Sequence, residues 1–207
     1  MLDVETPNDK ALSGLHELFA SATHDASAAM CRWTNGVIAV VLDEVRQAPL
    51  DGVSQELAVR DEMLTMVVIT LEGELGGSLI LMFDDLNGRQ LAASLLGQEV
   101  GTEPEWSDLE RSALMETGNI LGCAYVNALT RLIGTDLRPS PPYFIQDFAA
   151  SVLQQALMTQ AVVSDSVLLC EIGFHRKGKK LDWRVVFVPT PGLQDSLQRS
   201  LRATPPS

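Results

Sequence analysis

A line of polar side chains runs along residues 112–130, within a stretch that includes ALMETGNILGCAYVNAL and otherwise has the apolar spacing of a helix. An α-helix turns by about 100° per residue, so positions three or four apart share a face. On that basis six side chains point into one sector: Ser112, Glu116, Asn119, Cys123, Asn127 and Thr130. Leucines, a tyrosine and two glycines gather on the opposite side, which we expect to be buried. The polar line therefore lies on the outer face of the predicted helix.

The residue types on this outer face are unusual for a solvated helix. Such faces commonly carry lysine, glutamate, arginine and glutamine, whereas this one has short side chains and no lysine. Asn119 and Asn127 each cost about 0.5 kcal/mol of helix propensity relative to alanine. Two interpretations remain open from the pattern alone. The face is either a solvated or domain-facing helix side, or a flat surface that presents a carboxylate and an amide to a partner.

The spacing of these residues resembles the signature of the CheC/CheX/FliY family, which dephosphorylates CheY-type response regulators. That signature places an aspartate or serine, a glutamate and an asparagine on one helix, followed downstream by a proline. Here the matching residues are Ser112, Glu116, Asn119 and Pro142. The resemblance is closest to the CheC form of this helix, and it implies a cytoplasmic phosphatase of chemotaxis and two-component signalling.

The resemblance also implies roles for individual residues. Asn119 would orient the water that attacks the aspartyl-phosphate, and Glu116 would pair with a lysine of the receiver domain. Ser112 and Asn127 would shape the face or support docking. No metal of its own is implied, because the phosphorylated receiver carries the Mg²⁺. A CheD-like protein is a further candidate partner, and a non-catalytic receiver-binding or flagellar-switch-like adaptor is the alternative function.

The first long helix carries an incomplete copy of the same pattern. Ser13 and Glu17 occupy the positions of the serine and the glutamate, whereas Ala20 stands where the amide should be. Asp25 takes a position at which some members of the resembled family have a second asparagine, and no proline follows at the expected distance. We therefore predict one competent site, in the second half, and one degenerate face in the first.

The predicted elements occur in nearly the same order twice, which indicates an internal repeat. Each half begins with a long helix, continues through one strand and then a pair of strands, and ends with a helix; the second half adds a short helix. In the first half we expect helices at 9–35 and 87–97 and strands at 36–45, 63–73 and 75–83. In the second half we expect helices at 108–133, 147–157 and 192–201, an extended stretch at 137–145, and strands at 166–174 and 182–188. We predict a single α+β domain over residues 1–207, in which long helices pack on an antiparallel sheet with a pseudo-two-fold repeat of about 9–98 and 104–203.

Composition excludes several other classes of protein. The 207 residues carry a formal charge of −12, which argues against non-specific nucleic-acid binding, and 46 % of them are apolar. No apolar run approaches the ~20 residues that a membrane span requires, and the first ten residues do not resemble a signal peptide. Three widely separated cysteines suggest buried thiols in a reducing compartment. They are Cys31, Cys123 and Cys170.

The remaining candidate motifs favour ordinary structural roles. His16, His24 and His175 show no metal-ligand spacing such as HExxH, so we expect no metal site. The basic cluster HRKGKK at residues 175–180 lies between two strand-like runs. We interpret it as a solvated hairpin tip with Gly178 in the turn.

Overall fold

The computed structural model describes residues 7–56, 63–101, 103–158, 165–176 and 179–203. Within these residues, six strands form one antiparallel sheet in the order β1-β5-β6-β3-β2-β4. The strands are β1 (Ile38–Pro49), β2 (Met63–Leu71), β3 (Gly77–Phe83), β4 (Tyr143–Phe148), β5 (Ser166–Arg176) and β6 (Lys179–Pro189).

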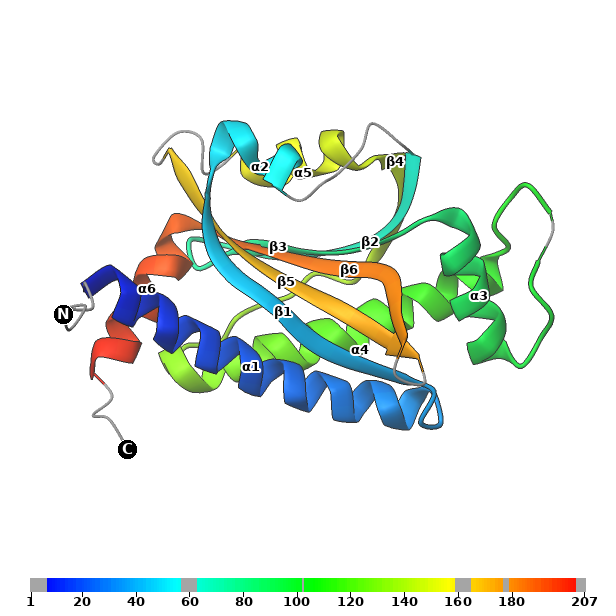
Figure 1. The fold of residues 1–207 in the computed structure, drawn as a ribbon, viewed down its shortest axis with the longest axis horizontal. Helices are drawn as coiled ribbons and strands as arrows, with labels where there is room; N and C mark the ends of the chain where they lie inside the picture. Colours follow the sequence, from blue (N-terminus) through cyan, green and yellow to red (C-terminus); the bar gives the residue numbers. More distant parts are fainter. Residues whose placement is uncertain (1–6, 57–62, 102, 159–164, 177–178, 204–207) are drawn as a thin grey trace.

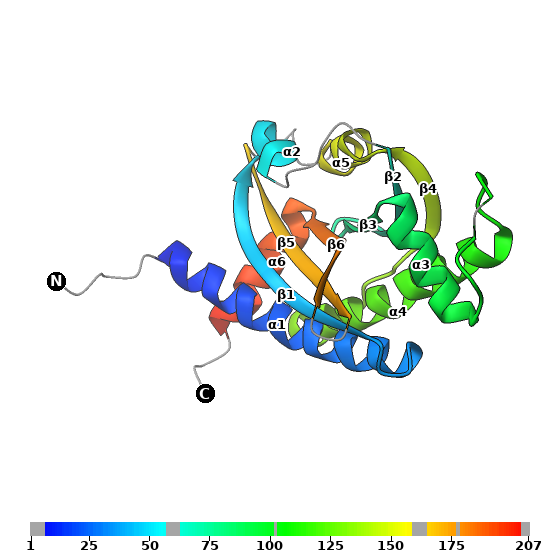
Figure 2. The same cartoon turned by 45° about the vertical axis from the view of Figure 1, so that its right-hand side comes forward.

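Helices cover both faces of this sheet (Figure 1). They are α1 (Pro7–Trp33), α2 (Val53–Glu56), α3 (Asp85–Leu96), α4 (Asp108–Ile133), α5 (Ala149–Leu157) and α6 (Pro191–Ala203). The long helices α1 and α4 pack against each other on one face, with α3 and α6 at their two ends. The short helices α2 and α5 lie on the other face, and the twisted sheet curls around them (Figure 2).

The sheet separates two apolar cores. The larger core joins α1, α3, α4 and α6 to one face of the sheet, and the smaller core joins α2 and α5 to the other face. Alternate residues of one strand enter different cores, because successive side chains of a strand point to opposite faces. In β2, Val67 and Ile69 belong to the larger core, whereas Met66 and Val68 belong to the smaller one. This two-sided burial explains why the central strands read as continuous apolar runs.

The predicted α+β fold with a pseudo-two-fold repeat is confirmed by the strand order. Exchanging the three strands of the first half with those of the second reverses the order of the sheet and leaves every neighbour relation unchanged. The two halves are also interleaved, because β1 pairs with β5 and β2 pairs with β4. Neither half therefore forms a separate sheet. The boundaries of the repeats, 9–98 and 104–203, stay a prediction.

The structure corrects several expectations about individual elements. The first half also contains a short helix, α2, so both halves run helix, strand, helix, strand, strand, helix. Strand β1 continues four residues past the predicted end at residue 45, because its far half pairs with β5. Strand β4 extends to Phe148, and α5 begins at Ala149 instead of residue 147. Gly178, the predicted turn residue of the hairpin, lies outside the described residues.

The prediction that the cysteine thiols are buried is wrong for two of the three. Cys170 is buried in β5, but Cys31 and Cys123 are exposed on α1 and α4. Burial raises the pKa of the Cys170 thiol well above its ordinary value, and the nearby Glu171 carboxylate raises it further. The two exposed thiols lie on outer helix faces because their positions face away from the larger core.

Candidate active face on helix α4

Helix α4 begins and ends where the sequence predicts. The Ser107 hydroxyl accepts a hydrogen bond from the Glu110 backbone N–H at 3.3 Å, and the Glu110 carboxylate accepts one from the Ser107 backbone N–H at 2.9 Å. This reciprocal capping box satisfies two of the backbone donors that a helix start leaves without partners. At the other end Gly134 has a φ of 66°, a left-handed conformation that glycine adopts without strain, and its N–H bonds to the Thr130 carbonyl.

The first turn of α4 is also fixed to α3. The buried Arg89 guanidinium bonds to the Asp85 carboxylate at 2.8 Å and lies 3.6 Å from Glu110. The same guanidinium stacks 4.6 Å from the ring centre of Trp106, whose indole N–H donates to Asp85 at 2.9 Å. Burial raises the pKa of Glu110, but hydrogen bonds from Ser107 and the charge of Arg89 outweigh it, so the pKa is lowered overall. Glu110 therefore stays ionised, as the capping box and the Arg89 pair require.

The buried face of α4 sits closely on strand β2. A Cβ atom added to Gly118 would lie 2.6 Å from Val67 Cγ1, and one added to Gly122 would lie 2.5 Å from Ile69 Cδ1. The two glycines therefore allow the helix to lie close to β2, where their neighbours are side chains of that strand. The distance between the helix and the sheet is set by this contact.

A buried hydrogen bond joins α4 to α1. The Thr23 hydroxyl donates to the Phe19 carbonyl at 2.6 Å, so it accepts from the Tyr125 hydroxyl, which lies 2.6 Å away. Burial, followed by the charge of Cys170, raises the pKa of Tyr125 far above its ordinary value, which keeps the hydroxyl protonated and able to donate. The Phe19 and Tyr125 rings pack beside this bond, with their centroids 6.3 Å apart. The orientation of α4 about its axis is thus fixed from two sides.

This orientation places the predicted residues of α4 on one exposed face. Five of the six side chains are exposed, and Thr130 is partly exposed; the five are Ser112, Glu116, Asn119, Cys123 and Asn127. Sequence reasoning did not predict the contact between two of them. The Cys123 thiol donates to the amide oxygen of Asn119, with an S···O distance of 3.7 Å. This weak bond holds the oxygen end of the amide toward the next turn of the helix and leaves its N–H donors directed elsewhere.

The corresponding residues of α1 are also accessible. Ser13 and Glu17 are exposed, and Ala20 is partly exposed, so the first helix presents a carboxylate without an amide. Asp25 accepts a hydrogen bond from the Arg131 guanidinium of α4 at 3.0 Å. The residue in place of a second asparagine therefore forms an ion pair between the two long helices.

The proline of the signature lies in the connection between α4 and β4. Pro142 immediately precedes Tyr143, the first residue of β4. Ser140, two residues earlier, ties this connection to β2, because its N–H donates to the Thr70 carbonyl at 2.7 Å and its hydroxyl accepts from the Thr70 N–H at 3.1 Å. The proline thus belongs to the segment that returns from the site helix to the edge of the sheet.

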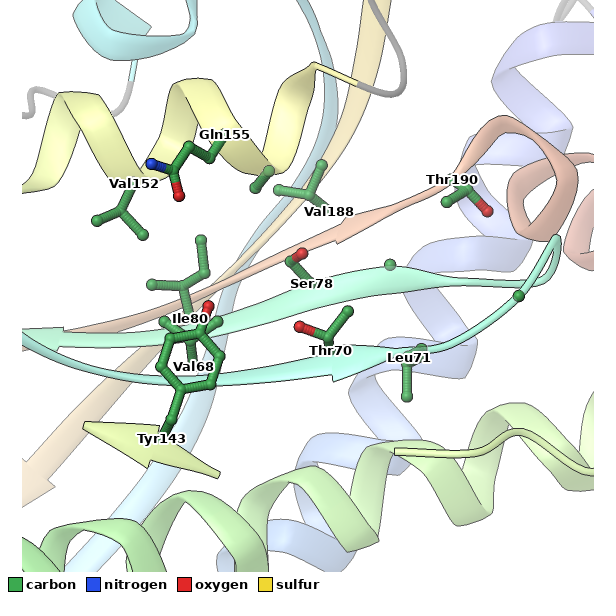
Figure 3. A pocket seen from close by; sticks show the side chains of 13 residues that line it. Val68, Thr70, Leu71, Ser78, Ile80, Tyr143, Val152, Gln155, Val188 and Thr190 are labelled. Carbon is green, nitrogen blue, oxygen red and sulfur yellow. The ribbon is translucent and has the colours of Figure 1, made fainter. Parts of the chain in front are cut away.

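A cavity of about 310 Å³ lies on the opposite face of the sheet, below α5 (Figure 3). Thr70, Ser78 and Gln155 point into it, together with apolar side chains such as Val152 and Val188. Among the residues that the structure describes, no charged side chain lines this cavity, and none of the residues predicted for the site is in its lining. Strand β2 separates it from α4. The candidate site is therefore an outer helix surface, which suits a macromolecular partner, and it is distinct from this cavity.

Among the described residues, no group of three or more His, Cys, Asp or Glu side chains is placed to hold a metal ion. No helix in the described part of the chain combines the length and the apolar character needed to cross a membrane.

Comparison with solved structures defines the class of the fold. The crystal structure of Thermotoga maritima FliY matches with a TM-score of 0.72 and 18 % identity, over 97 % of this chain and 98 % of that one. The crystal structure of a CheX–CheY–BeF₃–Mg²⁺ complex from Borrelia burgdorferi matches with a TM-score of 0.55 and 18 % identity, over 84 % and 97 %. The chain therefore shares the fold of FliY and CheX.

Within this class, the sequence is similar to CheC proteins. CheC1 of Halobacterium salinarum is 30 % identical over 109 residues, which cover 49 % of this chain and 54 % of the relative. The CheY-P phosphatase CheC of Bacillus subtilis is 27 % identical over 152 residues, which cover 72 % of each chain. The match thus spans about half the length of the first relative and nearly three quarters of the second. No protein-family model matches the chain. The resemblance to the CheC/CheX/FliY family that the sequence indicates is confirmed by these similarities.

Proposed function

We propose that this protein hydrolyses the aspartyl-phosphate of a CheY-type receiver domain at a single site on α4, in the cytoplasm, as part of chemotaxis signalling. The observation that carries the proposal is the exposed line of Ser112, Glu116, Asn119 and Asn127 on a helix whose start, end and rotation are all fixed. Similarity to a protein named CheY-P phosphatase supports the same substrate class.

Asn119 orients the nucleophile in this proposal. A water molecule held by the amide attacks phosphorus, the bond from phosphorus to the aspartate oxygen breaks, and inorganic phosphate and a free carboxylate result. The reaction depends chiefly on the position of the water in line with that bond. A neutral amide can bind the water without repelling the negative phosphoryl group. The contact from Cys123 favours one orientation of the amide.

Glu116 aligns the two proteins. It lies one helical turn from Asn119, so the two side chains start about 5–6 Å apart. Its exposed carboxylate is able to pair with the lysine at the phosphoryl group of the receiver. Ser112 and Asn127 extend the same face in both directions and complete the docking surface. The receiver holds Mg²⁺ at its own phosphoryl group, so the proposed reaction uses the metal of the partner.

The first helix takes no part in hydrolysis in this proposal. Glu17 presents a carboxylate, but the methyl group of Ala20 has no polar atom to orient water. The face of α1 is then available for another partner, for which a CheD-like protein is the candidate.

The experiment that tests this function is phosphate release from phosphorylated receiver domains, measured with and without the protein. We expect release above the rate of receiver self-hydrolysis for the cognate receiver. If phosphate release from every candidate receiver is equally fast with and without the protein, the phosphatase function is contradicted.

A non-catalytic receiver-binding or flagellar-switch-like adaptor is the second candidate. The missing amide on α1 favours it, because one copy of the motif already lacks the residue assigned to chemistry. Saturable binding of a receiver without accelerated phosphate release would support this second function.

A further inference from the structure

One large apolar side chain of α4 is exposed, whereas the other large apolar side chains of this helix are buried or pack on the larger core. Leu109, in the first turn, is 54 % exposed, and the structure describes every residue of this helix. The partly buried apolar residues of α4 all pack against the larger core: Met115, Ile120, Ala124, Leu132 and Ile133. A single exposed leucine is common on protein surfaces, so its position has to decide whether it has a role.

Leu109 lies on the same helical face as the proposed site. Seven residues rotate an α-helix by almost two full turns, so Leu109 points within about 20° of Glu116. It lies about 10 Å from Glu116 and about 15 Å from Asn119 along the helix axis. These separations fall within one protein–protein interface of ordinary size. A receiver docked over Asn119 would therefore cover Leu109 as well.

The first turn of α4 is rigid enough to present this side chain. Leu109 lies between Ser107 and Glu110, the two residues of the capping box. Arg89 and Trp106 fix the same turn to α3. An ordered apolar side chain loses less conformational entropy on binding than one on a frayed helix end. In the overlay that places Ser13 on Ser112, the equivalent position of α1 is Lys10, so an apolar residue occurs at this position only in the second half.

We propose that Leu109 is an apolar anchor for the receiver domain, burying its side chain against the receiver surface beside the phosphorylation site. The inference rests on the proposed function. Solvent-exposed charge pairs such as the one proposed for Glu116 contribute little affinity, whereas buried apolar anchors carry much of the binding free energy of an interface. Leu109 is the large exposed apolar side chain that α4 offers for this purpose.

The test compares two leucines of similar exposure. Leu109→Gln removes the anchor, and Leu86→Gln is the matched control, since Leu86 is 61 % exposed and lies in the first turn of α3. Leucine and glutamine have similar helix propensities, and both positions are exposed. The free energy of unfolding, measured in urea, should therefore be the same in both variants as in the wild type. We expect Leu109→Gln to raise KM for phosphorylated receiver about three- to tenfold with kcat unchanged, because a docking contact is equal in the ground and transition states. Leu109→Met should retain the wild-type KM.

The same variants are measured in binding to a receiver that carries a stable phosphoryl mimic, which separates this inference from the proposed catalysis. Weaker binding by Leu109→Gln alone supports the anchor even if the wild-type protein releases no phosphate. Wild-type affinity in Leu109→Gln, or an equal loss in Leu86→Gln, would overturn it. Absence of any receiver binding by the wild-type protein would overturn both the anchor and the proposed function.

Discussion

At the scale of single residues, the chemistry proposed for this protein depends on side chains that contribute little to its stability. Glu116 and Asn119 are exposed, and neither of them is a member of the apolar cores. Asparagine within a helix is unfavourable relative to alanine. A residue that lowers helix propensity on an accessible surface is more readily explained by function than by folding.

Asn119→Ala should abolish most phosphatase activity and leave the protein folded. We expect a loss of about 100-fold in kcat, because the attacking water is no longer held in line. The free energy of unfolding should be unchanged or slightly higher, since alanine is the better helix former. Phosphate release and urea unfolding are measured on the same preparation. A folded variant with wild-type turnover would show that Asn119 does not orient the water.

Glu116→Ala should weaken docking in a salt-dependent manner. An exposed ion pair contributes roughly 0.2–1 kcal/mol, so we expect a loss of affinity of up to about fivefold at low ionic strength. The difference from wild type should shrink at high salt, where the attraction is screened. Titration with a phosphoryl-mimic receiver at two salt concentrations measures it. Equal affinities at low salt would exclude a lysine-pairing role for Glu116.

At the scale of elements, the position of α4 on the sheet depends on two glycines that meet different neighbours. Gly118 faces Val67, whose branched side chain is stiff and whose Cβ would lie only 3.5 Å from the added atom. Gly122 faces the terminal methyl group of Ile69, whose other atoms are at least 3.8 Å away. The isoleucine can move its end group by rotation about its outer side-chain bond, whereas the valine has only its restricted inner bond and keeps its Cβ close to the added atom.

Gly118→Ala should therefore destabilise the protein, whereas Gly122→Ala should be close to neutral. Overpacking costs about 1–3 kcal/mol, and the gain in helix propensity returns about 1 kcal/mol. For Gly118→Ala we expect a net loss of about 1 kcal/mol, while at Gly122 rotation of the Ile69 end group reduces the cost. Urea unfolding of the two variants measures the difference. A smaller loss at Gly118 than at Gly122 would contradict this account of the contact with β2.

At the scale of the whole molecule, a symmetric fold carries asymmetric surfaces. The sheet order and the sequence of elements are the same for both halves, yet only α4 has the complete pattern of serine, glutamate and asparagine. The interleaved strands explain why the degenerate half is retained. Without β1 and β2, strand β4 would lose the strand it pairs with, and β5 would lose one of its two neighbouring strands.

Glu17→Ala tests this asymmetry. The exposed carboxylate of α1 has no part in the proposed chemistry, so receiver dephosphorylation should remain at the wild-type level. Glu116→Ala, measured beside it, is the matched change on the other helix and should lower the rate at subsaturating receiver. Loss of activity in Glu17→Ala would refute the assignment of a single site in the second half.

The sequence by itself determined the features that depend on local periodicity. The range of α4 was predicted closely, at about residues 108–133, because Ser107 and Glu110 have the spacing of a capping box at the helix start and the apolar periodicity runs to the observed end. The exposure of Glu116 and Asn119 followed from helical geometry alone, since residues three or four apart share a face in any α-helix. The α+β class followed from two different periodicities alternating along the chain.

Only the tertiary structure decided the features that depend on distant parts of the chain. Sequence reasoning could not predict that β1 pairs with β5, because strand pairing is set by packing between segments more than a hundred residues apart. It also missed the exposure of Cys31, the ion pair between Asp25 and Arg131, and the exposed Leu109 beside the site. In each case the environment of a side chain depends on which neighbour covers it. Helical periodicity indicates the direction of a side chain, but only packing determines what lies in that direction.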